Sequence, residues 1–260
     1  MRKPLDEELV RRGLASDRNA AREVIASGRV RVAGRPALKD STLVRPEDAV
    51  ALGPEARRFV SRGGEKLAAA LDRFGVEVAE RRCLDAGAST GGFTDCLLQA
   101  CASHVVAVDV GYGQLDWTVR NDPRVTVLER TNVRELRPED LPYRPEIVTA
   151  DLSFISLASV LPALVELSAP SAEFVLLVKP QFEAPPDAVE PGGVVRDPAA
   201  RAAAIEGIAR AAESCGLWPA GVMASPLKGP AGNAEFLLHA RRAGPGGALD
   251  VAAAVAEAER

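Results

Sequence analysis

The chain has 260 residues, is 47% hydrophobic and has a mean hydropathy near zero, which suits one large or two modest domains with buried cores. Its net charge of −4 does not suggest a nucleic-acid partner, but the charge is unevenly distributed. Residues 1–63 hold fourteen Lys or Arg against nine Asp or Glu, and residues 64–260 hold eighteen against twenty-seven. A basic amino-terminal part therefore predicts a domain that binds a polyanion.

The composition also argues against several protein classes. Neither the cysteines nor the two histidines have the spacing of a zinc site, so we expect no metal. Unpatterned cysteines fit a reducing cytosol, and we expect a cytoplasmic protein. No apolar stretch follows the first charged residues as in a signal peptide, and no run reaches the roughly 18 apolar residues of a membrane span. The residues concerned are Cys83, Cys96, Cys101, Cys215, His104 and His239.

The first 56 residues are predicted to form a small α+β domain. Apolar spacing predicts helices over 5–14 and 18–27, the second with Ser16 as its N-cap. An alternating strand follows over 28–34 and a last strand over 44–52. On the first of these strands, Arg29 and Arg31 are expected to point outward.

Residues 57–64 have the composition of a linker, and 65–243 are expected to form an α/β domain with a mostly parallel, doubly wound sheet. Such a sheet binds ligands at the carboxyl ends of its strands. The Ala-rich tail, 244–260, is expected to be a short helix or a frayed end. The predicted strands are 82–86, 104–109, 125–129, 146–150, 174–179, 220–224 and 235–241, and the predicted helices are 65–74, 91–101, 155–168 and 198–215.

A glycine-rich loop joins the first strand of this sheet to a helix. It lacks the glycine pattern of a dinucleotide site and the Gly-Lys-Ser/Thr of a P-loop. Asp85 would repel a pyrophosphate but suits the amino group of an amino-acid cofactor, and Asp109, at the next strand end, suits ribose hydroxyls. This arrangement predicts S-adenosylmethionine, the alternative being a tight turn with a solvated Asp109. The predicted cofactor-binding residues are Asp85, Gly87, Ser89, Thr90, Gly91, Gly92, Phe93, Asp109 and Val110.

Four charged residues at strand or helix ends are candidates for catalysis: Lys66, Asp151, Lys179 and Glu235. An apolar run delivers Lys179 to the ligand edge of the sheet, where crowding by Lys66 would favour a neutral amine. A neutral lysine can accept the proton of a ribose 2′-hydroxyl, which then attacks a sulfonium methyl group. Taken singly, Asp151 could merely cap a helix and Lys179 could be a solvated strand end. The long irregular stretch 181–197 is expected to lie beside the cleft.

Seven segments, in order, resemble the TlyA family of ribosomal RNA 2′-O-cytidine methyltransferases, historically called hemolysins. The resemblance runs from about residue 4 to about residue 242. It implies an FtsJ-type Rossmann-like class I methyltransferase domain, whose Lys-Asp-Lys-Glu tetrad falls on the four candidates above. The family includes members that modify the large-subunit RNA alone and members that modify both subunits. The segments are 62–67 (RGGEKL), 85–95 (DAGASTGGFTD), 109–115 (DVGYGQL), 151–156 (DLSFIS), 179–183 (KPQFE), 192–197 (GGVVRD) and 225–229 (SPLKG).

The amino-terminal part looks like an S4 RNA-binding domain, from residues 14–18 (LASDR), 25–30 (IASGRV) and Gly34. Asp17 departs from the basic or small residue common there, so phosphate contacts are expected to depend on Arg18 and Arg22. The implied partner is ribosomal RNA or a ribosomal subunit. The predicted RNA-binding residues are Arg2, Arg18, Arg22, Arg29, Arg31 and Lys39.

Three other functions are weighed against this one. A membrane-active hemolysin would need a spanning segment or a strongly amphipathic cationic helix, and the sequence predicts neither. An RNA-binding protein without catalysis would have lost a residue of the tetrad or the cofactor loop, and all are present. A methyltransferase for small molecules would not need the basic amino-terminal part.

Overall fold

The computed structural model describes residues 2–53, 58–244 and 246–259, which form two compact units, Met1–Arg58 and Phe59–Arg260. Residues 1 and 54–57 lie outside the described residues, so the structure describes only in part the predicted linker 57–64 and the ends of the predicted domain 1–56. Residues 59–64 of that linker belong to the second unit, because Phe59 is buried there. A Cβ on Gly64 would come within 2.3 Å of the Phe59 ring, so this glycine lets the ring pack on the backbone.

The first unit is a small α+β domain with two helices and two small sheets in the described residues. Strand β1 pairs with β4, and β2 pairs with β3 and β5, all antiparallel. Its core contains Leu5, Leu9, Ile25, Val30 and Val44. The elements are β1 (Lys3–Pro4), α1 (Leu5–Arg11), α2 (Arg18–Ala26), β2 (Val30–Val32), β3 (Arg35–Pro36), β4 (Leu43–Val44) and β5 (Val50–Leu52).

Three local predictions in this unit are wrong. Helix α1 ends at Arg11 and not at 14, since Gly13 takes a left-handed φ of 70°. The N-cap of α2 is Asp17 rather than Ser16, because Oδ1 of Asp17 accepts hydrogen bonds from the backbone N–H groups of Asn19 and Ala20. The predicted strand 44–52 is interrupted by a turn that Asp48 closes on the N–H of Arg45.

The second unit is a doubly wound α/β domain, as the sequence predicts. Its sheet has the order β11-β12-β10-β9-β6-β7-β8 in the described residues. Strands β8, β7, β6, β9 and β10 are parallel, and β12 is antiparallel to both β10 and β11. The strands are β6 (Arg82–Ala86), β7 (His104–Val108), β8 (Val125–Leu128), β9 (Ile147–Ala150), β10 (Glu173–Val178), β11 (Trp218–Ala224) and β12 (Phe236–Arg241).

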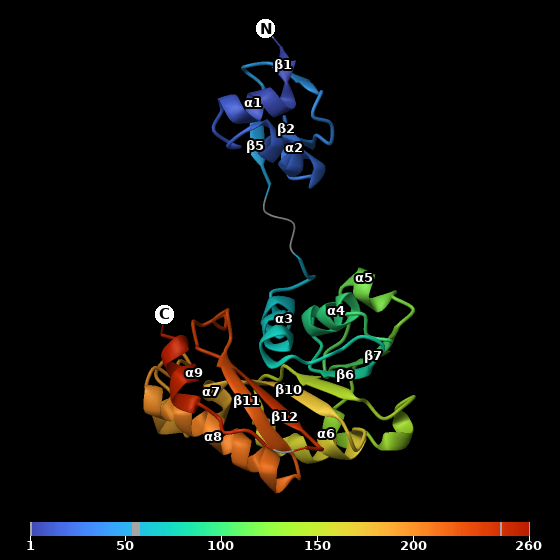
Figure 1. Ribbon diagram of the computed structural model, residues 1–260, viewed down its shortest axis with the longest axis vertical. Helices are drawn as coiled ribbons and strands as arrows, with labels where there is room; N and C mark the ends of the chain where they lie inside the picture. The colour runs from blue at the N-terminus through green and yellow to red at the C-terminus, as the bar shows by residue number, and fades with distance from the viewer. Residues whose placement is uncertain (1, 54–57, 245, 260) are drawn as a thin grey trace. The chain divides into compact units, whose positions relative to one another are not determined.

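Helices cover both faces of this sheet, α3 and α4 on one side and α6 and α8 on the other (Figure 1). In β10, Phe174 and Leu176 face one core and Val175 and Leu177 the other, as a strand buried on both faces requires. The helices are α3 (Gly63–Phe74), α4 (Gly92–Gln99), α5 (Trp117–Arg120), α6 (Leu161–Leu167), α7 (Pro180–Glu183), α8 (Pro198–Ser214) and α9 (Val251–Glu257), with 3₁₀ turns η1 (Val133–Glu135), η2 (Pro138–Asp140), η3 (Leu157–Ser159) and η4 (Pro186–Ala188).

One helical segment differs from expectation, whereas the tail forms a short helix, one of the two structures expected for it. The predicted helix 155–168 is divided into η3 and α6, because Ser156 caps the 3₁₀ turn and Pro162 lies in the first turn of α6. The tail contains α9, which Asp250 caps and which packs on β11 and α8, with Ala254 and Val255 buried.

Candidate functional site

A cavity of about 440 Å³ lies at the carboxyl ends of the parallel strands of the second unit. Its walls come from the segments that follow β6, β7, β8 and β9. Its lining residues include Gly87, Ser89, Asp109, Val110, Gln114, Thr131, Asn132, Asp151, Ser153 and Phe154.

The backbone at Gly87 lies directly against the backbone after β9. A Cβ built on Gly87 would be 2.4 Å from the carbonyl oxygen of Asp151, and its φ is 85°. Any side chain would therefore push the two strand ends apart and fill the space between them. This close approach is the physical reason for glycine at this point of the loop.

Asp109 follows β7 and faces the cavity with a half-buried carboxylate. Its Oδ2 accepts the backbone N–H of Ser89 at 2.7 Å, and its Oδ1 accepts that of Gly111 at 2.7 Å. These bonds fix the carboxylate, and each oxygen keeps lone-pair capacity for a further donor such as a hydroxyl.

The placement of Asp85 contradicts its predicted contact with a cofactor. The side chain is fully buried and lines neither this cavity nor the catalytic one described below. Thr94 Oγ1 donates to Oδ2 at 2.7 Å, and Thr149 Oγ1 donates to Oδ1 at 3.1 Å. Burial raises the pKa of Asp85 to about 7, although these hydrogen bonds oppose the rise. Through these two hydrogen bonds, Asp85 links β6 to α4 and to β9 beneath the glycine-rich loop.

A second cavity, of about 290 Å³, contains all four predicted catalytic residues. Lys66 Nζ lies 2.5 Å from Glu235 Oε2, and Lys179 Nζ lies 2.6 Å from Asp151 Oδ1. Lys179 also donates to Ser153 Oγ at 2.9 Å. The strand register explains the gathering, because Val178 pairs with Phe236, so that Lys179 and Glu235 come next to each other at one edge.

The sequence predicted that Lys66 crowds Lys179, and the structure shows that the two lysines line the same cavity and that each has a carboxylate partner. Each is in contact with a carboxylate, Lys66 with Glu235 and Lys179 with Asp151. The two cavities share Gly87, Ser89, Asp151 and Ser153 in their walls, so the four charged residues adjoin the cavity that holds Asp109.

The remaining predicted cofactor residues are divided between the cavities. Thr90, Gly92 and Phe93 line the cavity with the lysines, with Gly87 and Ser89. Val110 lines the Asp109 cavity and is exposed. Gly91 lines neither and instead is the N-cap of α4, packed on Leu115 and Val119.

Sequence reasoning missed several wall residues, of which Thr131, Asn132, Ser153 and Phe154 are the clearest. Thr131 and Asn132 come shortly after β8, so their place at a strand end was a usable signal. Phe154 has a left-handed φ of 65°, and the residue is 92% exposed. No sequence pattern indicates such a conformation for an aromatic residue.

The stretch 181–197 lies beside the cavity that contains the four charged residues, and hydrogen bonds hold it near both of its ends. Glu183 accepts hydrogen bonds from Ser156 Oγ and the backbone N–H of Leu157. Asn233, two residues before Glu235, donates to Gly193 O and accepts from the backbone N–H of Val195. Hydrogen bonds thus join this stretch to the segment just before β12, next to the site.

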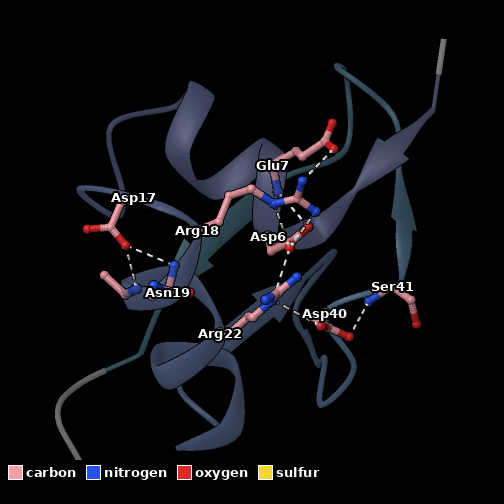
Figure 2. Close-up of polar contacts among 9 residues, drawn as sticks. Asp6, Glu7, Asp17, Arg18, Asn19, Arg22, Asp40 and Ser41 are labelled. Atoms are coloured by element: carbon pink, nitrogen blue, oxygen red, sulfur yellow. Dashed lines mark hydrogen bonds and ion pairs between the residues drawn. The ribbon is translucent and has the colours of Figure 1, made fainter.

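In the first unit, the structure separates the predicted RNA-binding residues into bonded and open ones. Arg18 and Arg22 are in contact with Asp6, as Figure 2 shows, so neither guanidinium is uncommitted. Arg29 is half-buried and donates to Gly53 O, which contradicts the outward orientation predicted for it. Arg31 is exposed and donates to Gly34 O. Arg2 and Lys39 are exposed.

Within the part of the chain that the structure describes, no cluster of three or more His, Cys, Asp or Glu could hold a metal ion. In the same residues, no helix combines the length and apolarity needed to cross a bilayer.

The fold and the charged site define a methyltransferase joined to an RNA-binding module. Residues 59–242 match the FtsJ-like methyltransferase family and residues 3–50 match the S4 domain, so the chain belongs to the FtsJ-like methyltransferases that carry an S4 domain. Its Rossmann-like class I fold, predicted from the sequence, is confirmed.

Individual relatives agree over nearly the whole length. The chain is 56% identical over 238 residues to the 16S/23S rRNA (cytidine-2′-O)-methyltransferase TlyA of Mycobacterium tuberculosis, covering 91% of this chain and 89% of the relative. It is 36% identical to Hemolysin A of Brachyspira hyodysenteriae, covering 90% and 98%. A solved structure from Streptococcus thermophilus, titled a hemolysin, has a TM-score of 0.75 and 35% identity, covering 99% of this chain and 96% of the other. The predicted resemblance to the TlyA family is thereby confirmed.

Proposed function

We propose that this protein transfers a methyl group from S-adenosylmethionine to the ribose 2′-hydroxyl of cytidine in ribosomal RNA. The observation that carries the proposal is the shared wall of the two cavities. Asp151 belongs to both, so the ion pair of Lys179 and Asp151 lies where a cofactor next to Asp109 would meet a second substrate. The similarity to the methyltransferase of Mycobacterium tuberculosis supports the choice of cytidine.

The residues of the Asp109 cavity fit this cofactor. Asp109 is fixed by two backbone N–H groups and can accept from ribose hydroxyls. Gly87 keeps the loop backbone close to the strand after β9, and the exposed Val110 offers an apolar surface at the rim. When bound, S-adenosylmethionine supplies an electrophilic methyl group on a sulfonium.

The ion pair of Lys179 and Asp151 would then lie where the proton of the 2′-hydroxyl is removed. We assign Lys179 Nζ as the group that takes the proton of the 2′-hydroxyl, and Asp151, 2.6 Å away, as the group that orients Nζ. Ser153 fixes the direction of Nζ through its hydrogen bond. Lys66 and Glu235, the second ion pair, line the same cavity and offset each other's charge there.

Aromatic rings next to the site suit an RNA substrate. Phe154 is almost fully exposed in the cavity wall, and Tyr112 is exposed with the Arg130 guanidinium 4.1 Å above its ring. Exposed rings can stack on an unpaired base. In the first unit, Lys39, Arg2 and the two arginines bonded to Asp6 are the proposed phosphate contacts. A ribosomal RNA substrate implies the cytoplasm, where ribosomal subunits would be the partners.

Mapping of methyl groups tests this proposal directly. Purified small subunits, large subunits and intact ribosomes are incubated with the protein and tritiated S-adenosylmethionine, and nuclease protection followed by mass spectrometry locates the label. A 2′-O-methylcytidine is expected, and Lys179→Met should not produce it. Label on a base nitrogen or carbon, or no transfer to RNA in any of the three substrates, would contradict the proposal.

A further inference from the structure

A buried carboxylate holds two arginines in the first unit. Asp6, in the first turn of α1, is only 2% exposed, whereas the side chains of Arg18 and Arg22 on α2 are each 52% exposed. Arg18 donates from Nε and Nη2 to Asp6 Oδ2 at 3.1 and 2.9 Å, and Arg22 Nε lies 3.4 Å from the same oxygen. Figure 2 shows both guanidinium groups converging on Asp6.

Two further carboxylates reach the same arginines from the surface. Glu7 Oε1 lies 3.3 Å from Arg18 Nη1, and Asp40 Oδ2 lies 3.4 Å from Arg22 Nε. The side chains of Glu7 and Asp40 are 41% and 48% exposed. Three carboxylates thus surround two guanidinium groups, so this cluster has no surplus positive charge to offer to RNA.

The three carboxylates differ in how easily they could be replaced. Asp6 is buried, and its other oxygen accepts the backbone N–H of Glu7 at 2.8 Å. Removing the arginines from Asp6 would leave a buried charge without a partner, which is costly. Ion pairs of exposed groups such as Glu7 and Asp40 contribute little, because water competes for both partners. A phosphate, which forms short charge-assisted hydrogen bonds with guanidinium groups, could take their places.

We propose that Asp6 is a positioning residue that holds Arg18 and Arg22 in place for the RNA backbone, and that Glu7 and Asp40 are stand-ins that RNA phosphates displace. This inference rests on the proposed RNA-binding role of the first unit. Asp6 fixes the planar fork of Arg18 through Nε and Nη2, which leaves Nη1 for the incoming phosphate. The exposed carboxylates make the arginines selective, since a ligand must compete with them to bind.

The two parts of the proposal predict changes of opposite sign. Asp6→Asn raises the net charge by one unit, so simple attraction predicts tighter RNA binding, whereas loss of positioning predicts weaker binding. We expect the full-length Asp6→Asn variant to bind a 23S ribosomal RNA transcript about tenfold more weakly in filter binding, as for the loss of a hydrogen bond to a charged group. Glu7→Gln and Asp40→Asn should each bind about twofold to fivefold more tightly.

Glu47→Gln is the matched control for charge. Glu47 is exposed in the same unit, and no ion pair to it is found among the described residues. The gain from Glu7→Gln and Asp40→Asn must exceed the gain from this control, and equal gains would overturn the displacement step. Hydrogen exchange of α1 and α2 in the full chain reports whether Asp6→Asn leaves the first unit folded.

If Asp6→Asn unfolds that unit, Arg18→Lys decides the positioning step, because lysine keeps the charge but lacks the fork. Arg18→Lys should also weaken binding about tenfold, and unchanged affinity would overturn the proposal, as would wild-type affinity in a folded Asp6→Asn variant. Failure of the proposed function looks different. In that case the wild-type protein itself would show no salt-dependent binding to the transcript.

Discussion

Thr94 Oγ1 donates a hydrogen bond to Oδ2 of Asp85 across 2.7 Å, and both side chains are fully buried beneath the cofactor loop. Burial raises the pKa of Asp85 to about 7, more than the hydrogen bonds from Thr94 and Thr149 lower it. The folded protein therefore retains a proton on Asp85 that an unfolded chain releases near the ordinary pKa of 3.8.

The first prediction concerns the pH dependence of stability. Between about pH 4 and pH 7 the folded state binds more protons at Asp85 than the unfolded state, so the contribution of Asp85 to stability declines as pH rises through this window and is constant above it. Asp85→Asn should remove that decline. Urea unfolding of both proteins at pH 5 and pH 8 measures it, and an identical pH dependence would refute the buried protonated state. Affinity for S-adenosylmethionine should change less than twofold.

The second prediction concerns Asp109, which faces the larger cavity. Asp109→Ala should weaken binding of S-adenosylmethionine by ~1–3 kcal/mol, since ribose hydroxyls would lose their acceptor. Asp109→Asn keeps one acceptor oxygen and should lose less. Glu129→Gln is the control, because Glu129 follows the neighbouring strand β8 and pairs with Arg120 outside this cavity. Calorimetry that finds equal affinities in all these proteins would exclude Asp109 from the cofactor site.

Sequence reasoning found the parts of this site that depend on strand ends. The apolar run before Lys179 and the strands before Asp151 and Asp109 placed these residues at one edge, because parallel strands end together. Sequence reasoning failed where the direction of a side chain determines whether it reaches the cavity. Asp85 also lies near the end of its strand, but its side chain points away from the cavity and toward Thr94 on α4, a direction that its position at a strand end does not reveal.

Partner choice was also beyond the sequence pattern. The spacing of α1 and α2 predicted their apolar faces, but the contact of Arg18 with Asp6 depends on how the two helices pack. In the same way, the sequence placed Lys66 near Lys179 but did not predict its ion pair with Glu235, because Lys66 lies on α3 and Glu235 precedes β12. Long-range pairing of charges needs the tertiary structure.

The third prediction concerns Lys39, which is exposed and follows Leu38 in the loop before β4. If Lys39 contacts a phosphate, Lys39→Gln should weaken binding to ribosomal RNA and lower the slope of log affinity against log salt by about one unit. Titrations over about a sixfold range of salt concentration, from roughly 50 to 300 mM, measure this slope. A variant with the wild-type slope would show that Lys39 lies outside the RNA contact, and its affinity for S-adenosylmethionine provides the check on folding.

The last prediction separates two roles for Lys179. As a general base it must give up a proton, and arginine cannot do so in proteins although it keeps the charge. As a purely electrostatic group next to the developing alkoxide, it could be replaced in part by arginine, with methionine clearly worse. We expect Lys179→Arg and Lys179→Met both to lose about 10²-fold or more in the rate of methyl transfer. The contact with Asp151 bears on both roles, because a carboxylate 2.6 Å away fixes the position of Lys179 Nζ in the wall that the two cavities share.

Single-turnover methyl transfer with saturating S-adenosylmethionine measures this difference without interference from product release. Ser153→Ala is the matched control, since it removes the hydrogen bond that Lys179 Nζ donates to Ser153 Oγ and leaves the ion pair with Asp151 in place. It should slow transfer by less than either substitution of Lys179, and cofactor affinity should be nearly unchanged in all three variants. Substantial activity in the arginine variant, with the methionine variant inactive, would reject the base and make Lys179 an electrostatic clamp.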